Sequence, residues 1–379
     1  MLTQSIISTA LFASIVLAQN VTVPSNPAWL KEIDLSQVPD IPVRPVGSGV
    51  CQNATCDGTD NDRCFESCGN AASEDDIFGC PQKNQWALTF DDGPSLLTAK
   101  LLDILDQTDV KATFCVTGSQ VKKYPEILRR AYLAGHQIAS HTYSHPHLMS
   151  LTNEQIINEV KSTEEAIKDV LGIRPLYIRP PYGEADTRVK KLLKLMGYKL
   201  LLWNVDPTDY SVYQQKDASA RIQGSFRLAI DGVDTGLNSH GDPGFISLQH
   251  DLYQASIDQV PEIIRTLRSK NFTLMTAAQC QNDINPHYIT DDSLKLQPAN
   301  QTLSAPSTTI ATSSIAWTIS NAAPTTSSNV IPPPVVVVKE NIYKEASFNG
   351  SKSTSDAISS ITKSALLALA LSFASLLTL

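Results

Sequence analysis

Acid, histidine and arginine side chains gather in five short clusters, each directly after a run of apolar residues. The clusters are Asp91-Asp92, His141 to His145, Arg179 to Tyr182, Asp206 to Asp209, and His250-Asp251. Two histidines four residues apart and one carboxylate supply three nitrogen and oxygen ligands, which is the ligand count of a catalytic zinc site with one open position. The clusters therefore contain the parts of a metal-assisted reaction.

The two adjacent acids of the first cluster are expected to have different chemical roles. Successive side chains of an extended segment face opposite ways, so Asp91 and Asp92 should not both point at one metal. One can bind the ion while the other acts as a base toward water. Pro146 disfavours a helical conformation for His145, so we place the histidine pair in a turn before a helix that begins near Thr152.

The periodicity of apolar residues predicts the elements that position these clusters. Six apolar runs are predicted strands, at 86–90, 112–116, 137–140, 176–179, 199–203 and 245–249. Spacings of three and four predict helices at 95–107, 120–134, 153–171, 188–196 and 257–269. Thr152 with Gln155 fits a capping box, and Gly135, Gly172 and Gly197 stand where helix C-terminal caps fall.

Alternation of strands and helices predicts a parallel sheet, open or closed into a barrel. Each cluster alone has an ordinary explanation, since adjacent acids are often helix N-caps and paired histidines occur on exposed helices. In a parallel sheet, however, active sites lie at the carboxyl ends of the strands, where all five clusters fall. Their shared position favours a catalytic role for the clusters over these ordinary explanations.

Composition limits the partners of the chain. Its 379 residues carry a net charge of -8, and no run of Lys or Arg is longer than a pair. A protein that binds a phosphate backbone needs a basic surface. We therefore expect no nucleic-acid partner.

Both ends of the sequence are typical of targeting segments. Residues 1–18 are uncharged at every side chain and end in Val16-Leu17-Ala18, which predicts a cleaved signal peptide, with an uncleaved anchor as the alternative. Asn-x-Ser/Thr sequons favour the secretory route, and we predict glycosylation at Asn20, Asn53, Asn271 and Asn300.

Residues 283–379 are predicted to form a stalk followed by an anchor signal. Residues 283–348 are predicted to be a Ser/Thr/Pro-rich stalk, which cannot bury enough apolar surface to fold. In 349–379, the small residues Asn349, Gly350 and Ser351 precede a polar spacer and an apolar tail, the order of a removed glycosylphosphatidylinositol (GPI) signal, attached at one of those three residues. A buried C-terminal helix is the alternative.

The seven cysteines favour disulfides. They stand at 51, 56, 64, 68, 80, 115 and 280, and five of them lie within 30 residues of the 19–83 segment, which has little core of its own. Disulfides suit a secreted chain better than a zinc knuckle, which needs reduced thiols. One cysteine must stay unpaired, and a pair between Cys115 and Cys280 would close the globular region near its ends.

The ordered motifs resemble the polysaccharide deacetylases of carbohydrate esterase family four, the NodB-homology domain. The resemblance covers residues 84–282 and rests on Thr89-Phe-Asp-Asp-Gly-Pro94, His141-Thr-Tyr-Ser-His145, Arg179-Pro-Pro-Tyr182, Asp206-Pro-Thr-Asp-Tyr210 and Leu248-Gln-His250. It implies a distorted (β/α) barrel and a divalent metal, usually zinc, with cobalt as a substitute. The Cys-rich N-terminal segment, with the approach Asp75-Asp-Ile-Phe-Gly-Cys-Pro81, resembles fungal chitin deacetylases in particular.

The resemblance also implies roles around the metal. Asp91 is similar to the catalytic base and Asp92 to a metal ligand, joined by His141 and His145. Arg179 is similar to the residue that orients the base.

Further roles follow for the later motifs. The backbone N–H of Tyr182 resembles an oxyanion donor, and His250 resembles the general acid, tuned by Asp209. Leu248 is similar to a residue of the acetate-methyl pocket. The fourth motif normally ends in Trp, where this chain has Tyr210, so Trp203 or Tyr210 itself is expected to complete the apolar wall.

The implied activity is hydrolysis of N-acetyl groups from chitin, giving chitosan and acetate, for modification of a cell wall. Two alternatives stay open: a deacetylase of another acetylated glycan such as xylan, and a non-catalytic, GPI-anchored wall glycoprotein that binds chitin. We expect a monomer that is secreted and tethered to the cell membrane, the cell wall or both.

Overall fold

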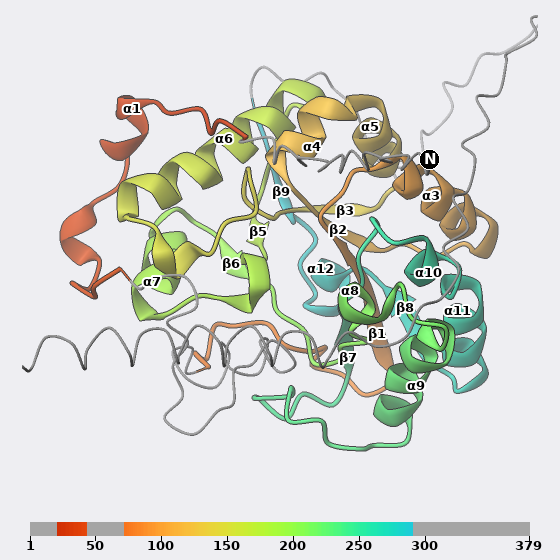
Figure 1. Cartoon of the computed structure of the whole chain (residues 1–379). Coiled ribbons are helices and arrows are strands. Elements are labelled where there is room, and N and C mark those ends of the chain that lie inside the picture. Colours follow the sequence, from red (N-terminus) through yellow and green to blue (C-terminus); the bar gives the residue numbers. More distant parts are fainter. Residues whose placement is uncertain (1–20, 44–71, 291–379) are drawn as a thin grey trace, which may run out of the picture. The chain divides into compact units, whose positions relative to one another are not determined.

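The computed structural model describes residues 21–43 and 72–290 (Figure 1). The predicted signal peptide, most of the predicted stalk, the GPI signal and the cysteines at 51, 56, 64 and 68 lie outside the described residues. So do the sequons at Asn20, Asn53 and Asn300, whereas Asn271 is described and exposed. No helix within the described ranges is long and apolar enough to cross a membrane.

A parallel sheet of seven strands forms the centre of the fold. Six of them run in the order β6 (Lys199–Leu200), β5 (Tyr177–Ile178), β3 (Gln137–Ser140), β2 (Thr113–Val116), β1 (Gln85–Asp91) and β7 (Phe245–Ser247). The seventh, β8 (Thr273–Met275), pairs with the first half of β1. An isolated parallel bridge joins Val205, just past β6, to Ser247 of β7. This bridge connects the two ends of the sheet, so the predicted distorted barrel is confirmed.

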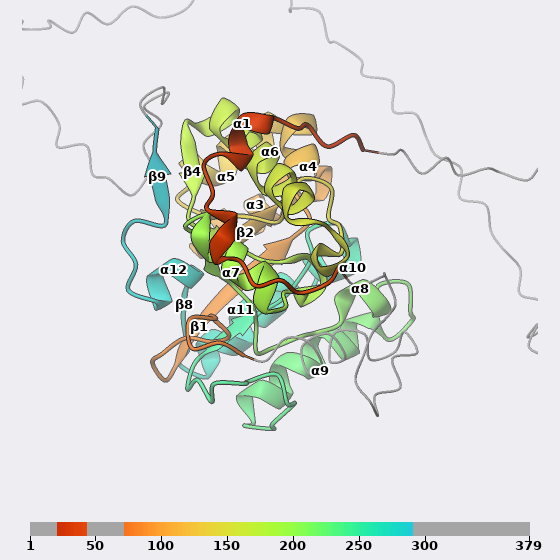
Figure 2. The ribbon, with the colours of Figure 1, turned by 90° about the vertical axis from the view of Figure 1, so that its left-hand side faces the viewer.

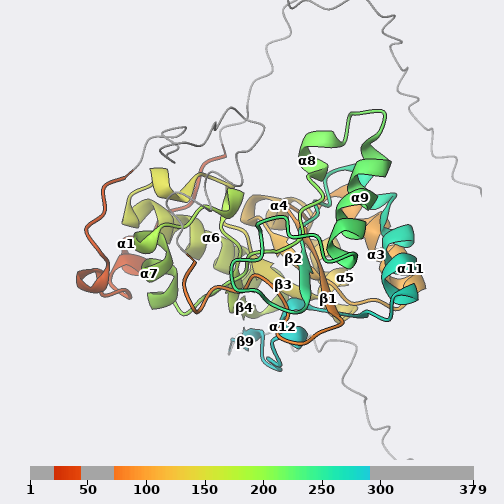
Figure 3. The same cartoon turned by 90° about the horizontal axis from the view of Figure 1, so that it is seen from below.

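Helices cover the outside of the strands (Figures 1 and 3). They are α3 (Leu96–Thr108), α4 (Gly118–Lys123), α5 (Pro125–Leu133), α6 (Asn153–Leu171), α7 (Thr187–Leu195), α9 (Ala218–Ile230), α10 (Gln254–Ile257) and α11 (Val260–Ser269). The short helix α8 (Asp209–Val212) lies at the carboxyl ends of the strands, and α12 (Ala277–Cys280) lies at their amino ends. A separate antiparallel pair joins β4 (Ile173–Pro175) to β9 (His287–Ile289).

Local signals in the sequence account for many of the helix ends. Thr152 caps α6 through the predicted box with Gln155, and Gly172 ends it with φ 67°. Only glycine adopts that left-handed conformation without a steric cost. The helix predicted at 120–134 is instead α4 and α5, because Pro125 lacks the N–H that a continuous helix needs and opens a new one. Prediction missed α9, where two of the four buried side chains are alanines that give little amphipathic signal.

Three apolar clusters make up the core. One lies between the strands and the outer helices and contains Trp86 and Phe114, and a second fills the barrel around Tyr177. The third lies beneath α6 and α7, and Trp29 and Leu30 of the N-terminal segment pack against it. The helix that carries them, α1 (Pro27–Leu30), lies along α6 (Figure 2). The folded part therefore extends beyond residues 84–282 on both sides.

A disulfide ties the start of the folded region to its end. Cys80 and Cys280 are joined across 200 residues, with their Cα atoms 5.4 Å apart. Cys115 is free and buried on β2. The considered pair between Cys115 and Cys280 is therefore wrong, because Cys115 is directed into the barrel beside β1 while Cys80 lies next to Cys280.

Candidate active site

Side chains from the ends of β1, β3, β5 and β7 meet at one end of the barrel, as predicted. Asp91 is the last residue of β1, and His141 and Arg179 directly follow β3 and β5. A parallel bridge joins Asp91 to His250, three residues past β7. The strands place these side chains because the carboxyl ends of parallel strands point the same way.

Asp92, His141 and His145 form the predicted metal-ligand cluster. The Asp92 Oδ1 atom lies 3.5 Å from His141 Nε2 and 3.4 Å from His145 Nε2. Left-handed backbone at Thr142 (φ 67°) and His145 (φ 59°) folds the histidine pair into a turn, as predicted, rather than a helix. The turn brings the two imidazole centroids to 4.9 Å.

The orientation of the first two acids differs from the prediction. Asp92 has φ 75°, so the chain leaves the extended conformation there. As a result both carboxylates approach the same atom, since Asp91 Oδ2 lies 3.7 Å and Asp92 Oδ1 lies 3.5 Å from His141 Nε2. The two carboxylates are therefore neighbours in space as well as in sequence.

These three ligands fit a divalent cation. His141 Nδ1 lies 2.7 Å from the Arg179 carbonyl oxygen, which can only accept, so Nδ1 carries the proton and the Nε2 lone pair is free to bind. Burial lowers the pKa of His141 and of His145 to about 4, which keeps both rings neutral. The buried Asp92 Oδ1 atom accepts no hydrogen bond from any described residue. A cation is the partner that such an atom lacks.

Arg179 holds the Asp91 carboxylate. Its Nη1 donates to Asp91 Oδ1 at 2.7 Å, and both side chains are buried. Burial by itself would raise the pKa of Asp91, but the charge of the Arg179 guanidinium, aided by the His250 ring, holds it below the usual value. Asp91 is therefore ionised and able to accept a proton.

Asp209 holds His250 in a similar way. The Asp209 Oδ1 atom lies 2.7 Å from His250 Nδ1, and Oδ2 accepts the His250 backbone N–H at 2.8 Å. Burial opposes the charged ring, yet the Asp209 carboxylate outweighs it and raises the pKa of His250 to about 10. His250 is therefore a proton donor at neutral pH.

Tyr182 lies in a turn next to the metal ligands. It has left-handed backbone, with φ 60° and ψ 10°, and its ring meets the His145 ring edge-on at 4.6 Å. Its backbone N–H donates to no acceptor within 21–43 and 72–290. An unpaired N–H beside the ligand cluster is suited to bind an oxyanion.

The predicted substrate-contacting residues divide into two groups. Tyr182 and Tyr210 line a cleft, and the Tyr210 ring lies 5.4 Å from the His250 ring. Leu248 and Trp203 are each 3% exposed. Trp203 lies under the Arg179 guanidinium at 5.4 Å, so a contact of Trp203 or Leu248 with substrate stays a prediction.

The glycine of the first motif makes room for a buried acid. A Cβ atom at Gly93 would lie 2.2 Å and 2.6 Å from the two carboxylate oxygens of Asp251. Thr98 donates to that carboxylate at 2.6 Å, and burial raises the pKa of Asp251 to about 7. Gly93 is therefore required because the backbone beside Asp92 packs directly on this side chain.

Comparison with known proteins identifies the family. The model of the family described as polysaccharide deacetylase matches residues 78–201. A chitin deacetylase of Colletotrichum lindemuthianum is 34% identical over 213 residues, 55% of this chain and 83% of the relative. The chain belongs to the polysaccharide deacetylase family.

A solved structure and a second relative define the extent of the likeness. The solved structure of the Colletotrichum lindemuthianum chitin deacetylase superposes with a TM-score of 0.51 at 33% identity, covering 56% of this chain and 95% of that one. Chitin deacetylase 1 of Cryptococcus neoformans var. grubii is 39% identical over 255 residues, 64% of this chain. The chain spans about half, 53%, of that relative's length. Members of the family depend on a divalent metal, and the Asp92, His141 and His145 cluster is a possible site for one.

Two side chains that the sequence did not predict also lie against the site, His147 and Glu184. His147 is stacked on Tyr182 and lies within hydrogen-bonding distance of Glu184. The only available signal was a third histidine two residues after His145.

Proposed function

We propose that this protein hydrolyses N-acetyl groups from chitin, a β-1,4-linked N-acetylglucosamine polymer, and releases acetate. The observation that carries the proposal is the arrangement of an ionised Asp91 and a protonated His250, which are neighbours across a strand bridge, beside one ligand cluster. Amide hydrolysis needs both a base for water and an acid for the leaving amine. The names of the relatives in fungi support chitin as the substrate.

Each residue has a role in that reaction. A divalent cation held by Asp92, His141 and His145, zinc in our proposal with cobalt as a substitute, supplies positive charge that acidifies water and polarises the acetamide carbonyl. Asp91, fixed by Arg179, accepts the proton of the attacking water. His250, held by Asp209, donates a proton to the leaving nitrogen, since an amine anion does not depart unaided.

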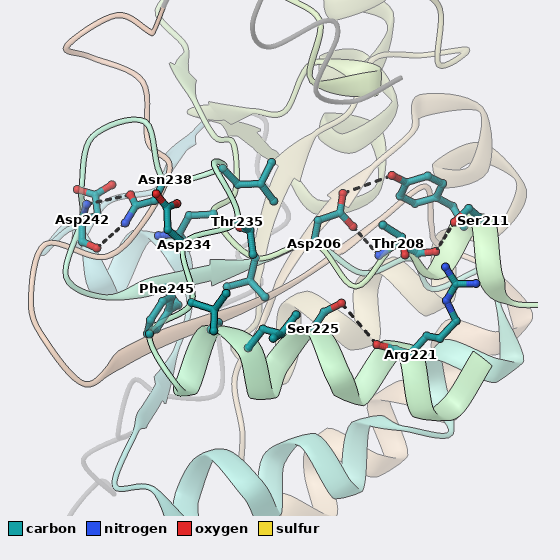
Figure 4. A pocket seen from close by; sticks show the side chains of 18 of the residues that line it. Asp206, Thr208, Ser211, Arg221, Ser225, Asp234, Thr235, Asn238, Asp242 and Phe245 are labelled. Carbon is teal, nitrogen blue, oxygen red and sulfur yellow. Dashed lines mark hydrogen bonds between the residues drawn. The ribbon is translucent and has the colours of Figure 1, made fainter. Parts of the chain in front are cut away.

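A cleft beside the site is suited to a polymer. Its volume is about 1000 Å³, and it lies between the loop that follows β6, helix α9 and the segment that leads into β7 (Figure 4). Tyr182 and Tyr210 line the cleft and also contact His145 and His250, so it is continuous with the site. Apolar side chains such as Leu228 and polar ones such as Asn238 line it together. Sugar rings offer apolar faces and hydroxyl edges that match such a mixed lining.

Blocking the cleft should affect long substrates selectively. Ser225 of α9 lines the cleft, so Ser225→Trp should lower kcat/KM on a chitin pentamer about tenfold, the equivalent of about 1.4 kcal/mol of binding. The rate on the dimer should change less than about twofold. Ser219→Trp is the matched control, because Ser219 lies on the same helix but is exposed and bonds to Gln259. Equal losses on both substrate lengths would contradict a role for the cleft.

Acetate release from defined chitin oligomers tests the function directly. The full-length secreted protein should release acetate from oligomers, stop when the metal is chelated, and resume when zinc or cobalt is added. Acetylated xylan serves as the competing substrate. Acetate from xylan alone would replace chitin by another glycan, and no acetate from either would support a non-catalytic wall glycoprotein.

We also propose the domain organisation and location that the sequence predicts. The chain is secreted after removal of residues 1–18, carries its catalytic domain on a stalk, and is GPI-anchored at Asn349, Gly350 or Ser351 on the cell membrane or in the wall. The C-terminal peptide of the mature protein decides the anchor, since an intact apolar tail would refute it. A monomeric state stays a prediction, to be measured by light scattering.

A further inference from the structure

A histidine and a glutamate outside the predicted site contact Tyr182. The His147 ring lies parallel to the Tyr182 ring, with centroids 3.9 Å apart and an interplanar angle of 6°. His147 Nδ1 donates to Glu184 Oε1 at 2.6 Å, and the Glu184 side chain is 1% exposed. The Tyr182 ring is thus in contact with His147 as well as with the edge of His145.

The two partners of Tyr182 are themselves fixed. His147 immediately precedes the 3-10 turn Leu148–Ser150, and Leu148 is fully buried. Glu184 closes the turn that contains Tyr182, since its backbone N–H donates to the Pro181 carbonyl at 3.1 Å. The hydrogen bond between His147 and Glu184 therefore joins the loop of the metal-binding histidines to the Tyr182 turn.

The backbone of Tyr182 needs such support. A residue other than glycine in left-handed conformation, here with φ 60°, persists only when its surroundings hold it there. The ring contact restrains the Tyr182 side chain, and the hydrogen bond from the Glu184 N–H to the Pro181 carbonyl closes the backbone turn around Tyr182. Together the ring contact and the closed turn restrain the peptide plane that carries the Tyr182 N–H.

We propose that His147 and Glu184 are a pair of positioning residues that hold Tyr182 so that its backbone N–H is aimed at the developing oxyanion. This inference rests on the proposed function, to which the Tyr182 N–H would contribute by stabilising the oxyanion of the transition state. Neither side chain needs to touch substrate. Their effect passes through Tyr182.

Kinetics provide the first test. His147→Ala should lower kcat about 10- to 100-fold while KM changes less than about twofold, because a misaimed oxyanion donor weakens the transition state rather than substrate binding. His147→Phe keeps a ring to stack and should recover part of the loss. Glu184→Gln keeps an oxygen that accepts from His147 and should lose less than Glu184→Ala.

Two further measurements separate this role from others. In a protein that already carries Tyr182→Ala, adding His147→Ala should lower kcat by a further factor of less than about two. The effects of two substitutions are not additive when one residue acts through the other. Metal content per chain should stay at the wild-type level. His240→Ala is the control, because His240 is an exposed histidine that also makes an edge contact, with Phe78.

A spectroscopic readout keeps the proposal independent of activity. In protein labelled with ¹⁵N-tyrosine, the Tyr182 amide resonance, assigned by its loss in Tyr182→Phe, should shift or broaden in His147→Ala and stay in place in His240→Ala. An unmoved resonance, loss of metal in His147→Ala, or a defect confined to KM would overturn the proposal. If the wild type releases no acetate from chitin oligomers, the proposed function fails, and the amide resonance still decides the positioning role.

Discussion

Asp91→Asn should slow acetate release about 10²- to 10⁴-fold while the protein keeps its metal, because that range is the usual worth of a general base. The asparagine oxygen can still accept the hydrogen bond that Arg179 Nη1 donates at 2.7 Å, so the local structure should survive. An amide, however, cannot take up a proton from water. Substrate binding should change little.

Asp92→Asn should fail in a different way, by losing the metal. Asp92 Oδ1 is the carboxylate atom nearest to both histidine Nε2 atoms, and an amide is a poorer ligand than a carboxylate for such a cation. Metal content per chain, measured beside kcat on a chitin pentamer, distinguishes the two variants. Asp258→Asn is the control, since Asp258 pairs with Lys100 on the surface. If Asp91→Asn lost metal and Asp92→Asn kept it, the two roles would be reversed.

Asp209→Asn should remove activity at neutral and alkaline pH. In the wild type the Asp209 carboxylate raises the pKa of His250 to about 10, so the acid is protonated up to that pH and activity should fall only as pH rises through it. Without the Asp209 carboxylate, only the smaller effects of Asp92 and Asp91 oppose the lowering of the His250 pKa by burial. The basic limb of the pH–rate profile should therefore move to lower pH, with a loss at pH 8 of about 10²- to 10⁴-fold, the worth of a general acid.

The direction of this shift is the decisive measurement. The activity of Asp209→Asn should recover partly as pH falls, because His250 then becomes protonated even without the Asp209 carboxylate. Asp258→Asn again serves as the control and should keep the wild-type profile. A variant whose basic limb stays near pH 10 would show that Asp209 does not tune His250.

The sequence predicted the local features of this architecture. Capping by Thr152, the end of α6 at Gly172 and the boundaries of β1, β2 and β3 depend on residues within a few positions of one another. The clustering of the five motifs at one end of a barrel followed from the rule that parallel strands share a direction. Periodicity and short spacings carry such information because they report backbone conformation and burial of one face.

The sequence could not fix contacts that join distant residues. The pairing of Cys80 with Cys280 spans 200 residues, and Cys115 took no part because its strand directs it into the barrel. The contact between His147 and Glu184 joins residues 37 positions apart on two separate turns. Neither leaves a periodic pattern, since each depends on how whole elements pack.

The sequence by itself determined at which end of the strands the polar clusters lie, and it predicted which of their side chains do the chemistry. Tertiary structure decided how they face one another. Left-handed backbone at Asp92 directs two adjacent acids at one histidine, and the neighbouring charges of Arg179 and Asp209 keep Asp91 ionised and His250 protonated against the effect of burial. Both effects arise from three-dimensional surroundings, because a dihedral angle outside the common regions and a shifted pKa are imposed on a residue by its neighbours in space.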